Sequence, residues 1–336
     1  MDSAVRRIGV LTSGGDAPGM NAAIRAVTRT ALHLGIECVG IRRGFNGLIN
    51  GDEEILDYAR VSGISRMGGT MLYSARSKEF QTEEGIQKAV NTCKLLGLDG
   101  IVGIGGDGTF RGLHDLSDHG IAVIGVPGTI DNDISCSTYT LGYDTACNTA
   151  VECIDKLQDT MQSHERCSVV EVMGHRAGHL ALYVGVACGA TSVLIPEKEV
   201  SFEEDVLEPI RRARLGGRTH FMVIVAEGVE GGAYEVGNKI KEATALDTRV
   251  TVLGHIQRGG SPTARDRVTA TYMGYDAVML LASGKTDRVV CMQNDSYVDF
   301  DITEALSMKK GIDEQNYTVM RTLIGGPNFS MVRKHK

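Results

Sequence analysis

The sequence predicts an α/β protein with two doubly wound domains and largely parallel sheets. Three observations support this fold class. The 336 residues suffice for two domains that each bury a core. Short β-branched apolar segments alternate with helical patterns along the chain. Glycine, with 42 residues, is frequent but has no triplet period, and it therefore indicates tight turns and close backbone approaches rather than a collagen-like or disordered chain.

The individual elements follow from the positions of these segments. Buried strands are predicted at residues 5–11, 38–41, 100–104, 121–126, 168–173, 192–195, 220–226 and 250–253. Helices are predicted at residues 20–34, 83–95, 144–163, 202–214 and 268–283. Gly35, Gly97 and Gly284 each fall just after a helical pattern, where a left-handed capping residue is expected. No Pro- or Ser-rich linker marks a domain joint, so we place it near the long helix that begins at Asp144.

Charge and cysteine content narrow the class of partner and compartment. The chain has 35 basic and 42 acidic residues, a net charge of -7, and no basic block that would attract nucleic acid or an anionic membrane. Its eight cysteines show no CxxC or metal-ligand spacing and read as reduced core residues. No apolar stretch has the length of a signal peptide or a membrane span. We therefore expect a cytoplasmic protein.

Two glycine-rich turns follow predicted strands, at the sheet edge where α/β proteins bind ligands. Residues 14–19 (GGDAPG) can turn backbone N–H groups and a helix N-terminus towards a phosphate, although an ordinary strand-to-helix turn would look similar. Residues 103–109 (GIGGDGT) contain GxGxxG. A dinucleotide site would need an acidic residue at the end of the next strand, and residues 121–127 end without one. Asp107 is better interpreted as a magnesium ligand.

A third phosphate-loop pattern, at residues 283–286 (SGKT), is rejected. Met279 stands where a Walker loop needs its first glycine, and a predicted helix rather than a strand precedes the segment.

Two further turns carry titratable side chains. In residues 127–133 (PGTIDND), Asp131 and Asp133 can point into one cleft, one to take a proton from a hydroxyl and the other to organise metal or solvent. Local Asx turns are the alternative explanation. In residues 253–262 (LGHIQRGGSP), His255 and Arg258 stand on a glycine-flanked loop, and the guanidinium suits a phosphate monoester. A capped surface loop would show the same pattern.

The segments LTSGGDAPGMNAAIR, IGGDGT, PGTIDND, SVVEVMG and TVLGHIQRGGSP occur together in this order. In this the chain resembles the bacterial-type ATP-dependent 6-phosphofructokinases, from about residue 7 to residue 305. The resemblance implies an active site in the cleft between an ATP-binding domain (1–142 plus 255–306) and a fructose 6-phosphate-binding domain (143–254 plus 307–336). It also implies Mg²⁺-dependent transfer of a phosphoryl group from ATP to the sugar 1-hydroxyl, which yields fructose 1,6-bisphosphate and ADP in glycolysis.

The resemblance assigns roles to individual residues. The catalytic group would be Asp131 as base, with Thr129, Asp133, Arg76 and Arg176. ATP would be held by Gly14, Arg76, Ser77, Gly106, Asp107, Gly108 and Thr109, with Asp107 on Mg²⁺. Fructose 6-phosphate would be held by Thr129, Ile130, Asp131, Arg166, Met173, Gly174, His175, Glu227, Arg249, His255, Ile256, Gln257 and Arg258. Effectors would bind Arg25, Arg29 and Arg218. A homotetramer is implied, in which Arg166 and Arg249 reach into a neighbour's site.

Some positions depart from the family pattern. His175 precedes Arg176 where members usually show Met-Gly-Arg, and Gln81 replaces a further arginine. Tyr58, Gln158 and Gly216 stand at effector positions that are commonly basic.

The donor and the reaction class are also open to rival interpretations. Pyrophosphate-using members tend to carry Asp and Lys where this chain has Gly108 and Gly128, so the glycines favour ATP. Two rival functions are an NAD or lipid kinase with the GGDGT loop and a non-catalytic regulatory paralogue.

Overall fold

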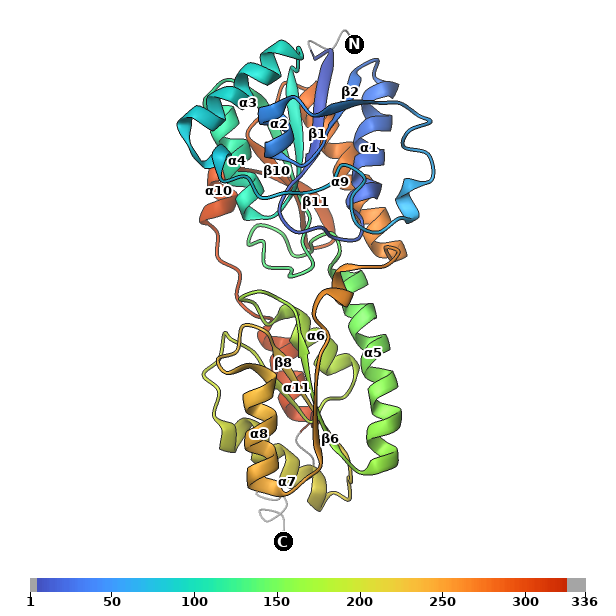
Figure 1. Ribbon diagram of the computed structural model, residues 1–336, viewed down its shortest axis with the longest axis vertical. Helices are drawn as coiled ribbons and strands as arrows, with labels where there is room; N and C mark the ends of the chain where they lie inside the picture. Colours follow the sequence, from blue (N-terminus) through green and yellow to red (C-terminus); the bar gives the residue numbers. More distant parts are fainter. Residues whose placement is uncertain (1–4, 325–336) are drawn as a thin grey trace. The chain divides into compact units, whose positions relative to one another are not determined.

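Two compact units make up the chain in a computed structural model that describes residues 5–324. Figure 1 labels their elements. Unit 1 comprises the described residues up to Ile130, together with Ile134–Thr145 and Arg258–Lys310. Unit 2 comprises Asp131–Asp133, Ala146–Gln257 and the described residues from Gly311 onward. Each unit is an α/β structure with largely parallel strands, which confirms the predicted fold class.

The unit boundaries differ slightly from the expected ones. The sequence placed the joints after residues 142, 254 and 306, whereas the units change after Thr145, Gln257 and Lys310. Asp131–Asp133 were expected in the first domain, but they belong to unit 2 because the chain leaves the sheet of unit 1 when β5 ends at Pro127. Residues 325–336 of the expected second domain lie outside the described residues.

Unit 1 is built on a seven-stranded sheet of order β11-β10-β5-β4-β1-β2-β3. Its elements are β1 (Arg7–Thr12), α1 (Met20–His33), β2 (Glu37–Ile41), α2 (Phe45–Asn50), β3 (Glu53–Leu56), 3-10 turns at Ile64–Arg66 and Glu79–Gln81, α3 (Glu83–Leu95), β4 (Gly100–Gly105), α4 (Asp107–Asp118), β5 (Ala122–Pro127), α9 (Ala264–Ala282), β10 (Arg288–Gln293), β11 (Ser296–Asp301) and α10 (Ile302–Ser307). The five inner strands are parallel, and β3 and β11 are antiparallel edges. The crossover from β1 to β2 runs in the opposite direction to that from β4 to β5, so right-handed connections put α1 and α4 on opposite faces.

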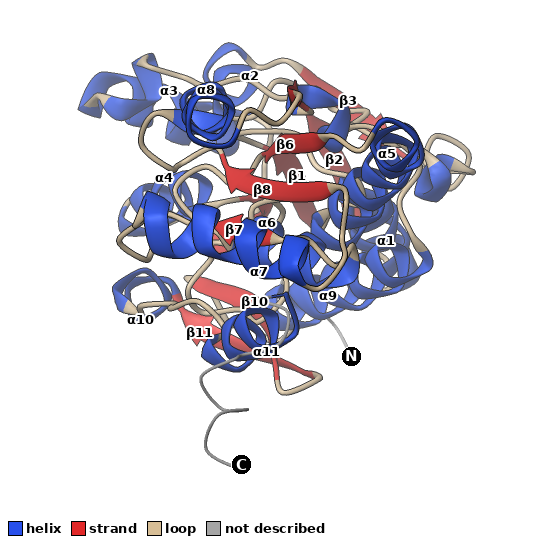
Figure 2. Ribbon diagram, turned by 90° about the horizontal axis from the view of Figure 1, so that it is seen from below, coloured by secondary structure: helices blue, strands red, loops and turns tan. Residues whose placement is uncertain are grey.

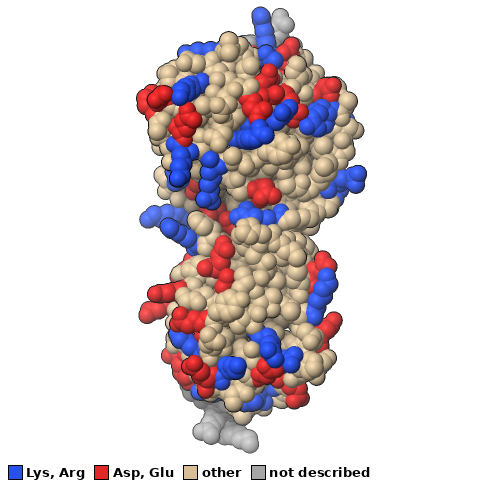
Figure 3. Space-filling model, viewed as in Figure 1, with Lys and Arg blue, Asp and Glu red and all other residues tan. Residues whose placement is uncertain are grey.

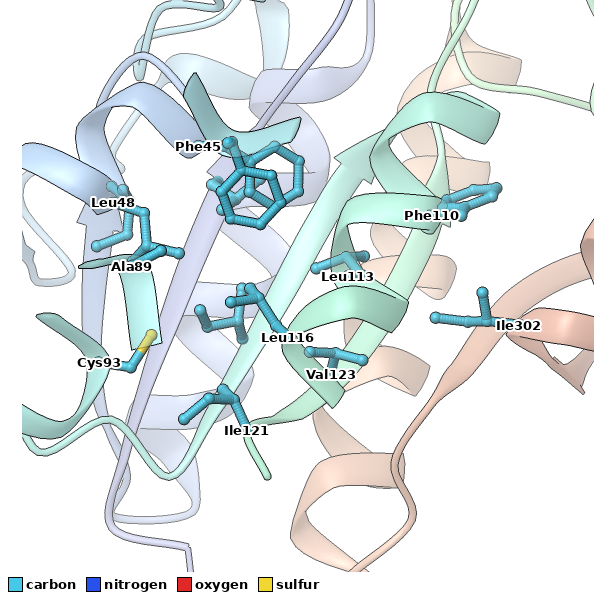
Figure 4. Close-up of a cluster of buried hydrophobic side chains, with 14 of the residues drawn as sticks. Phe45, Leu48, Ala89, Cys93, Phe110, Leu113, Leu116, Ile121, Val123 and Ile302 are labelled. Atoms are coloured by element: carbon cyan, nitrogen blue, oxygen red, sulfur yellow. The ribbon is translucent and has the colours of Figure 1, made fainter. Parts of the chain in front are cut away.

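One hydrophobic cluster of unit 1 lies under α2, α3, α4 and α10 (Figure 4). Phe45 and Phe80 stack in it with ring centroids 4.2 Å apart. Gly112 of α4 faces these rings, because a Cβ there would lie 2.7 Å from Phe45. This glycine therefore lets α4 pack closely against the two rings.

Unit 2 has a four-stranded, entirely parallel sheet of order β7-β8-β6-β9. Its elements are α5 (Tyr143–His164, which begins in unit 1), β6 (Cys167–Val172), α6 (His179–Ala187), β7 (Ser192–Leu194), a π-helix at Phe202–Leu207, α7 (Glu208–Leu215), β8 (Phe221–Ala226), α8 (Gly232–Thr244), β9 (Thr248–Val252), a 3-10 turn at Gly254–Arg258 and α11 (Glu314–Ile324). Helices flank the strands (Figure 2). The opposite directions of the β6-to-β7 and β8-to-β9 crossovers place α6 and α8 on opposite faces.

The helix predicted at residues 202–214 divides into the π-helix and α7 between Leu207 and Glu208, just before Pro209. Proline has no N–H to donate to the carbonyl of Asp205. The Ser192 hydroxyl donates to that carbonyl instead. The expected continuous α-helix was therefore wrong at its first two turns.

The structure also bears on the expected helix caps, cysteines, membrane segments and surface charge. Gly35, Gly97 and Gly284 have φ of 75°, 64° and 79°, which confirms the left-handed caps. All eight cysteines are free thiols. None of the helices in residues 5–324 combines the length and apolar character needed to cross a bilayer. On the face shown in Figure 3, basic and acidic side chains are interspersed over both units, as is typical of a solvated surface.

Candidate active site

In unit 1 the two glycine-rich segments meet at the carboxyl edge of the sheet. They follow β1 and β4, which are parallel neighbours with Thr12 opposite Ile104. The Ser13 N–H donates to the Ile104 carbonyl (3.0 Å). The Thr109 hydroxyl donates in turn to the Ser13 carbonyl (3.2 Å). These bonds bring residues 14–19 and 105–109, which the sequence singled out separately, into one structure.

The glycines of these segments serve two different purposes. A Cβ on Gly105 would lie 2.3 Å from the Thr109 Oγ1 and 2.4 Å from the Ser13 carbonyl oxygen, so the junction requires glycine. In contrast, a Cβ on Gly14 or Gly108 would have no heavy atom within 4 Å. Gly14 also has φ +85°, a conformation that side chains disfavour. Gly105 thus closes the junction, and Gly14 and Gly108 leave open space beside it.

Asp107 and Thr109 lie in the first turn of α4, where the sequence had indicated only a loop. The N–H groups at this helix start face away from the helix and can bind an anion. Asp107 is half-buried there. Residues 5–324 contain no group of three or more His, Cys, Asp or Glu side chains arranged around a metal. A single carboxylate beside open space nevertheless fits Mg²⁺, which takes most of its other ligands from phosphate oxygens and water.

The segment 67–77 is fastened to the same edge by residues that the sequence analysis did not single out. Asn21 of α1, which is 1% exposed, donates to the carbonyls of Met67 and Gly68 and accepts from the Met71 N–H (2.7 Å). The Thr12 hydroxyl donates to the Tyr73 carbonyl (2.9 Å).

Two predicted ATP residues follow at the end of this segment. The Ser77 Oγ accepts from the Phe80 N–H (3.2 Å), and Arg76 is exposed. The structure therefore gives Ser77 a local bond and leaves Arg76 facing solvent.

The turn after β5 begins beside the glycine junction. The Gly128 N–H donates to the Gly105 carbonyl (2.9 Å), and the Thr140 hydroxyl donates to the Thr129 carbonyl (2.7 Å). A Cβ on Gly128 would lie 3.1 Å from Ile104 and 3.2 Å from Met20, so this glycine contacts packed side chains. Gly108 lines open space, whereas Gly128 does not.

The residues after Gly128 in this turn, 129–133, are divided between the two units. Thr129 and Ile130 belong to unit 1, whereas Asp131 and Asp133 belong to unit 2. Asp131 is only 7% exposed. Ile130 is fully buried, so its side chain is part of the core, and only its backbone can contact a ligand.

At the carboxyl edge of unit 2, two side chains shape the loop after β6. Glu227, which follows β8, accepts at one carboxylate oxygen from the N–H groups of Gly174 (3.2 Å) and His175 (2.6 Å). His175 has φ 56°, a left-handed conformation that these bonds stabilise. Gln257, fully buried, accepts from the Met173 N–H (3.3 Å) and donates to the Gly254 carbonyl (3.1 Å). Gln257 therefore supports the loop, although it was expected to bind substrate directly.

Met173 is 8% exposed, and five other predicted residues at this edge are exposed. They are His175, Arg176, Glu227, His255 and Ile256. Arg258 belongs to unit 1 and contacts the first glycine turn, residues 14–19. Its Nη1 donates to the Asp16 carbonyl (3.2 Å). A Cβ on Gly15 would lie 2.5 Å from the Arg258 guanidinium, so glycine is needed for this contact too.

Arg166 and Arg249 lie at the opposite, amino-terminal edge of the unit 2 sheet. Arg166 directly precedes β6, and Arg249 is the second residue of β9. Both contact the carboxylate of Asp247, Arg166 through Nε (2.5 Å) and Arg249 through Nε (3.3 Å). The hydrogen bond from Arg166, and the charges of Arg249 and Arg166, hold the pKa of Asp247 below its usual value. Asp247 was not expected from the sequence.

The predicted effector residues divide between the units. On α1, Arg25 and Arg29 lie one turn apart, and the Arg29 guanidinium stands 5.5 Å from the ring centroid of Tyr58. Burial, and then the neighbouring Arg29 charge, lower the pKa of Arg25. Arg218 lies in unit 2 and is exposed.

The other two departures at effector positions lie in unit 2 as well. Gln158 donates to the Cys188 carbonyl (2.9 Å), and Gly216 ends α7 as its C-terminal cap.

Comparisons with known proteins agree with this geometry. The Phosphofructokinase family model matches residues 7–281. An ATP-dependent 6-phosphofructokinase from Clostridium botulinum is 53% identical over 319 residues, which are 95% of this chain and 99% of that protein. A solved phosphofructokinase from Saccharomyces cerevisiae is 31% identical with a TM-score of 0.85, and the match covers 98% of this chain but only 49% of the yeast chain.

A pyrophosphate-dependent phosphofructokinase from Marinobacter aquaeolei has the same fold, with a TM-score of 0.82 at 21% identity and coverage of 96% and 93%. Because the family model spans most of the residues and the clostridial relative matches nearly the whole length, the chain belongs to the phosphofructokinase family.

Proposed function

We propose that this chain phosphorylates fructose 6-phosphate at its 1-hydroxyl with Mg-ATP, forming fructose 1,6-bisphosphate and ADP in glycolysis. One observation carries the proposal within the family. The two glycine segments and the PGTIDND turn, which are far apart in sequence, are joined by backbone hydrogen bonds at Ser13, Gly105 and Gly128. The two glycine segments that we propose to bind the phosphates are therefore bonded directly to the turn that contains the buried Asp131.

Nucleotide binding is assigned to unit 1. The triphosphate would lie on the N–H groups around Gly14 and at the start of α4, from Gly106 to Thr109, with Arg76 and Ser77 beside it. The Asp107 carboxylate would hold Mg²⁺, which when bound neutralises developing charge on the phosphate oxygens. Open space at Gly108 supports ATP over pyrophosphate as donor. Gly128 adds no such support, because its surroundings are filled.

The chemical step needs a base and fixed cations. Asp131 would accept the proton of the sugar 1-hydroxyl, with Thr129 and Asp133 placing the hydroxyl, since in-line phosphoryl transfer depends on positioning and charge stabilisation. Arg76 and Arg176 would face the transferring phosphoryl group. An arginine is charged at every working pH, whereas a histidine is mostly neutral at pH 8, and we therefore assign the cation to Arg176 rather than His175.

Sugar binding is assigned to unit 2, with one part supplied by another subunit. Met173 and Glu227 lie beyond the carboxyl ends of their strands, and Arg166 lies before the amino end of β6. Six residues at about 3.3 Å each separate these edges by roughly 20 Å, which exceeds the length of a sugar phosphate. One chain cannot use both edges for one ligand. This supports an oligomer in which Arg166 and Arg249 complete a neighbour's site, and the family resemblance makes that oligomer a homotetramer in the proposal.

The proposal also covers effector binding and cellular location. Arg25, Arg29 and Arg218 would bind an anionic effector, and the two α1 arginines, which lie together without a carboxylate bonded to either in residues 5–324, support that role. The eight free thiols support a cytoplasmic location.

A coupled assay for ADP release with fructose 6-phosphate and Mg-ATP tests the function. Asp131→Asn should lower kcat by about 10² to 10⁴ while leaving fructose 6-phosphate binding measurable. Thr138→Ser, a conservative change just after the turn, is the control. Retention of more than about a tenth of wild-type kcat by Asp131→Asn would refute the base assignment.

The same assay separates the rival functions. Turnover of NAD in place of fructose 6-phosphate would support a kinase of the GGDGT type. Binding of the sugar phosphate without any ADP release would support a regulatory paralogue.

Shared sites are tested by mixing two inactive chains. Hybrids of Asp131→Asn with Arg166→Ser should recover part of the activity, because some sites then have both residues intact. Hybrids that are verified by mass but show no activity would refute the shared site.

A further inference from the structure

Asp247 is the shared partner of two arginines that the proposed function places on the sugar phosphate. Its Oδ2 accepts from the Arg166 Nε at 2.5 Å. Its Oδ1 lies 3.3 Å from the Arg249 Nε, and its Oδ2 accepts from the Arg249 Nη2 at 3.4 Å. Strand pairing places Ser168 of β6 opposite Arg249 of β9. The two guanidinium groups therefore come from neighbouring strands and converge on one carboxylate.

The way each arginine uses its donors leaves nitrogen atoms available. Arg166 is held through Nε, and within residues 5–324 no hydrogen bond or ion pair occupies its Nη1 or Nη2. Arg249 is held through Nε and Nη2, which leaves Nη1. A phosphate monoester binds arginine best through paired N–H groups at the end of the fork. The contact with Asp247 thus orients both side chains and leaves both terminal nitrogens of Arg166, and Nη1 of Arg249, for a phosphate.

A structural role accounts for only part of this arrangement. The side chains of Asp247, Arg249 and Arg166 are 47%, 63% and 28% exposed. The exposed pair of Asp247 with Arg249 contributes little to stability. Two arginine side chains that are close together repel each other, and each is free to adopt many rotamers. Asp247 offsets the repulsion and limits the rotamers. The benefit is a higher affinity for a ligand that binds both arginines.

We propose that Asp247 is a positioning residue for sugar-phosphate binding: it holds Arg166 and Arg249 together with their remaining guanidinium N–H groups directed to one phosphate. The inference rests on the proposed function. Ordering of each long side chain on binding carries an entropic cost, so holding two of them in advance is worth about five- to twentyfold in affinity. The Asp247 charge also repels the phosphate, but through water this is worth less than about fivefold. We therefore expect the positioning effect to dominate.

The experiment compares steady-state kinetics of the full-length enzyme and its variants. Asp247→Ala should raise KM for fructose 6-phosphate about five- to twentyfold, with kcat at saturation and KM for ATP within about twofold of wild type. Asp247→Glu, which keeps the charge, should recover most of the loss. Glu242→Ala removes an exposed carboxylate on α8 of the same unit. It controls for the general loss of negative charge and should leave KM unchanged.

A double-mutant cycle then tests whether the effect passes through the arginines. In an Arg166→Ala, Arg249→Ala background, Asp247→Ala should cause no further increase in KM, because the side chains that it positions are absent.

Three results would overturn the inference: an unchanged or lowered KM in Asp247→Ala, an equal increase in Glu242→Ala, or an undiminished effect in the arginine-free background. A wild type without fructose 6-phosphate turnover would instead refute the proposed function itself, so the two failures are distinguishable.

Discussion

The carboxyl edges of the two units are held in place by different means. In unit 1, the glycine segments are joined mainly through backbone atoms, and Gly105 fits only because it has no side chain. In unit 2, the loop after β6 is held by the carboxylate of Glu227 and the amide of Gln257. Unit 1 should therefore be sensitive to added atoms, whereas unit 2 should be sensitive to removed ones.

The largest effect is expected from adding one methyl group at the junction in unit 1. Gly105→Ala places a Cβ 2.3 Å from the Thr109 Oγ1 and 2.4 Å from a backbone oxygen of Ser13. Overpacking of this kind costs about 1–3 kcal/mol, and the shift would also move the glycine segments that are proposed to bind the phosphates. We expect a lower midpoint of urea unfolding and a raised KM for ATP, with KM for fructose 6-phosphate much less affected.

Gly108→Ala is the matched control for stability, because its Cβ meets nothing within 4 Å. Alanine there also favours the helix. Equal destabilisation by both changes would show that backbone conformation, rather than close packing, requires these glycines.

The opposite sensitivity is tested in unit 2 by removal of an amide. Gln257→Ala leaves the Met173 N–H and the Gly254 carbonyl without their partner. A buried polar group left unsatisfied costs about 1–3 kcal/mol. We expect a lower unfolding midpoint and a raised KM for fructose 6-phosphate, with KM for ATP unchanged. Leu215→Ala, at a side chain of the same unit that is 73% exposed, is the control. A loss confined to KM for ATP would contradict the division of roles between the units.

The fold was largely predictable because most inner strands are short, buried segments rich in β-branched residues, and such segments can be recognised from consecutive residues alone. The buried inner strand β10 was missed although it has this signal. Other missed elements have a weaker one. Helix α4 starts within the glycine turn and contains Gly108 and Gly112, which weaken a helical pattern. The edge strand β11 (SYVDFD) is only partly buried, and two aspartates interrupt its apolar residues. The π-helix depends on a hydroxyl from Ser192, which no local pattern can reveal.

The candidate site divides in the same way. Segments that carry their candidate chemistry in consecutive residues, such as GGDGT and TIDND, could be singled out from the sequence, because turn geometry is encoded locally. Supporting side chains were not. Asn21 contacts residues about 50 positions away, and Asp247 contacts Arg166 from 81 positions away. Such partners are brought together by the sheet, so a single sequence shows each of them as an ordinary polar residue.

The smallest effect concerns the pH dependence of stability in unit 1, away from the glycine segments. His114 of α4 lies 3.0 Å from the Asp287 carboxylate, with Asp115, Asp118 and Thr303 nearby. The hydrogen bond with Asp287 raises the pKa of His114. A raised folded-state pKa stabilises the protein fully below the unfolded value of about 6.5, and this contribution is lost as pH rises through the folded pKa.

His114→Gln should therefore lower Tm near pH 6 but not near pH 9. The corresponding loss in the free energy of unfolding is roughly 0.5 kcal/mol or less, because the pair is partly exposed. Asp287→Asn should give the same profile, and the double variant should add nothing. Thermal unfolding between pH 5.5 and 9 measures this. A Tm difference that grows with pH would mean that neutral His114 is the stabilising form, since only then would protonation weaken the folded state.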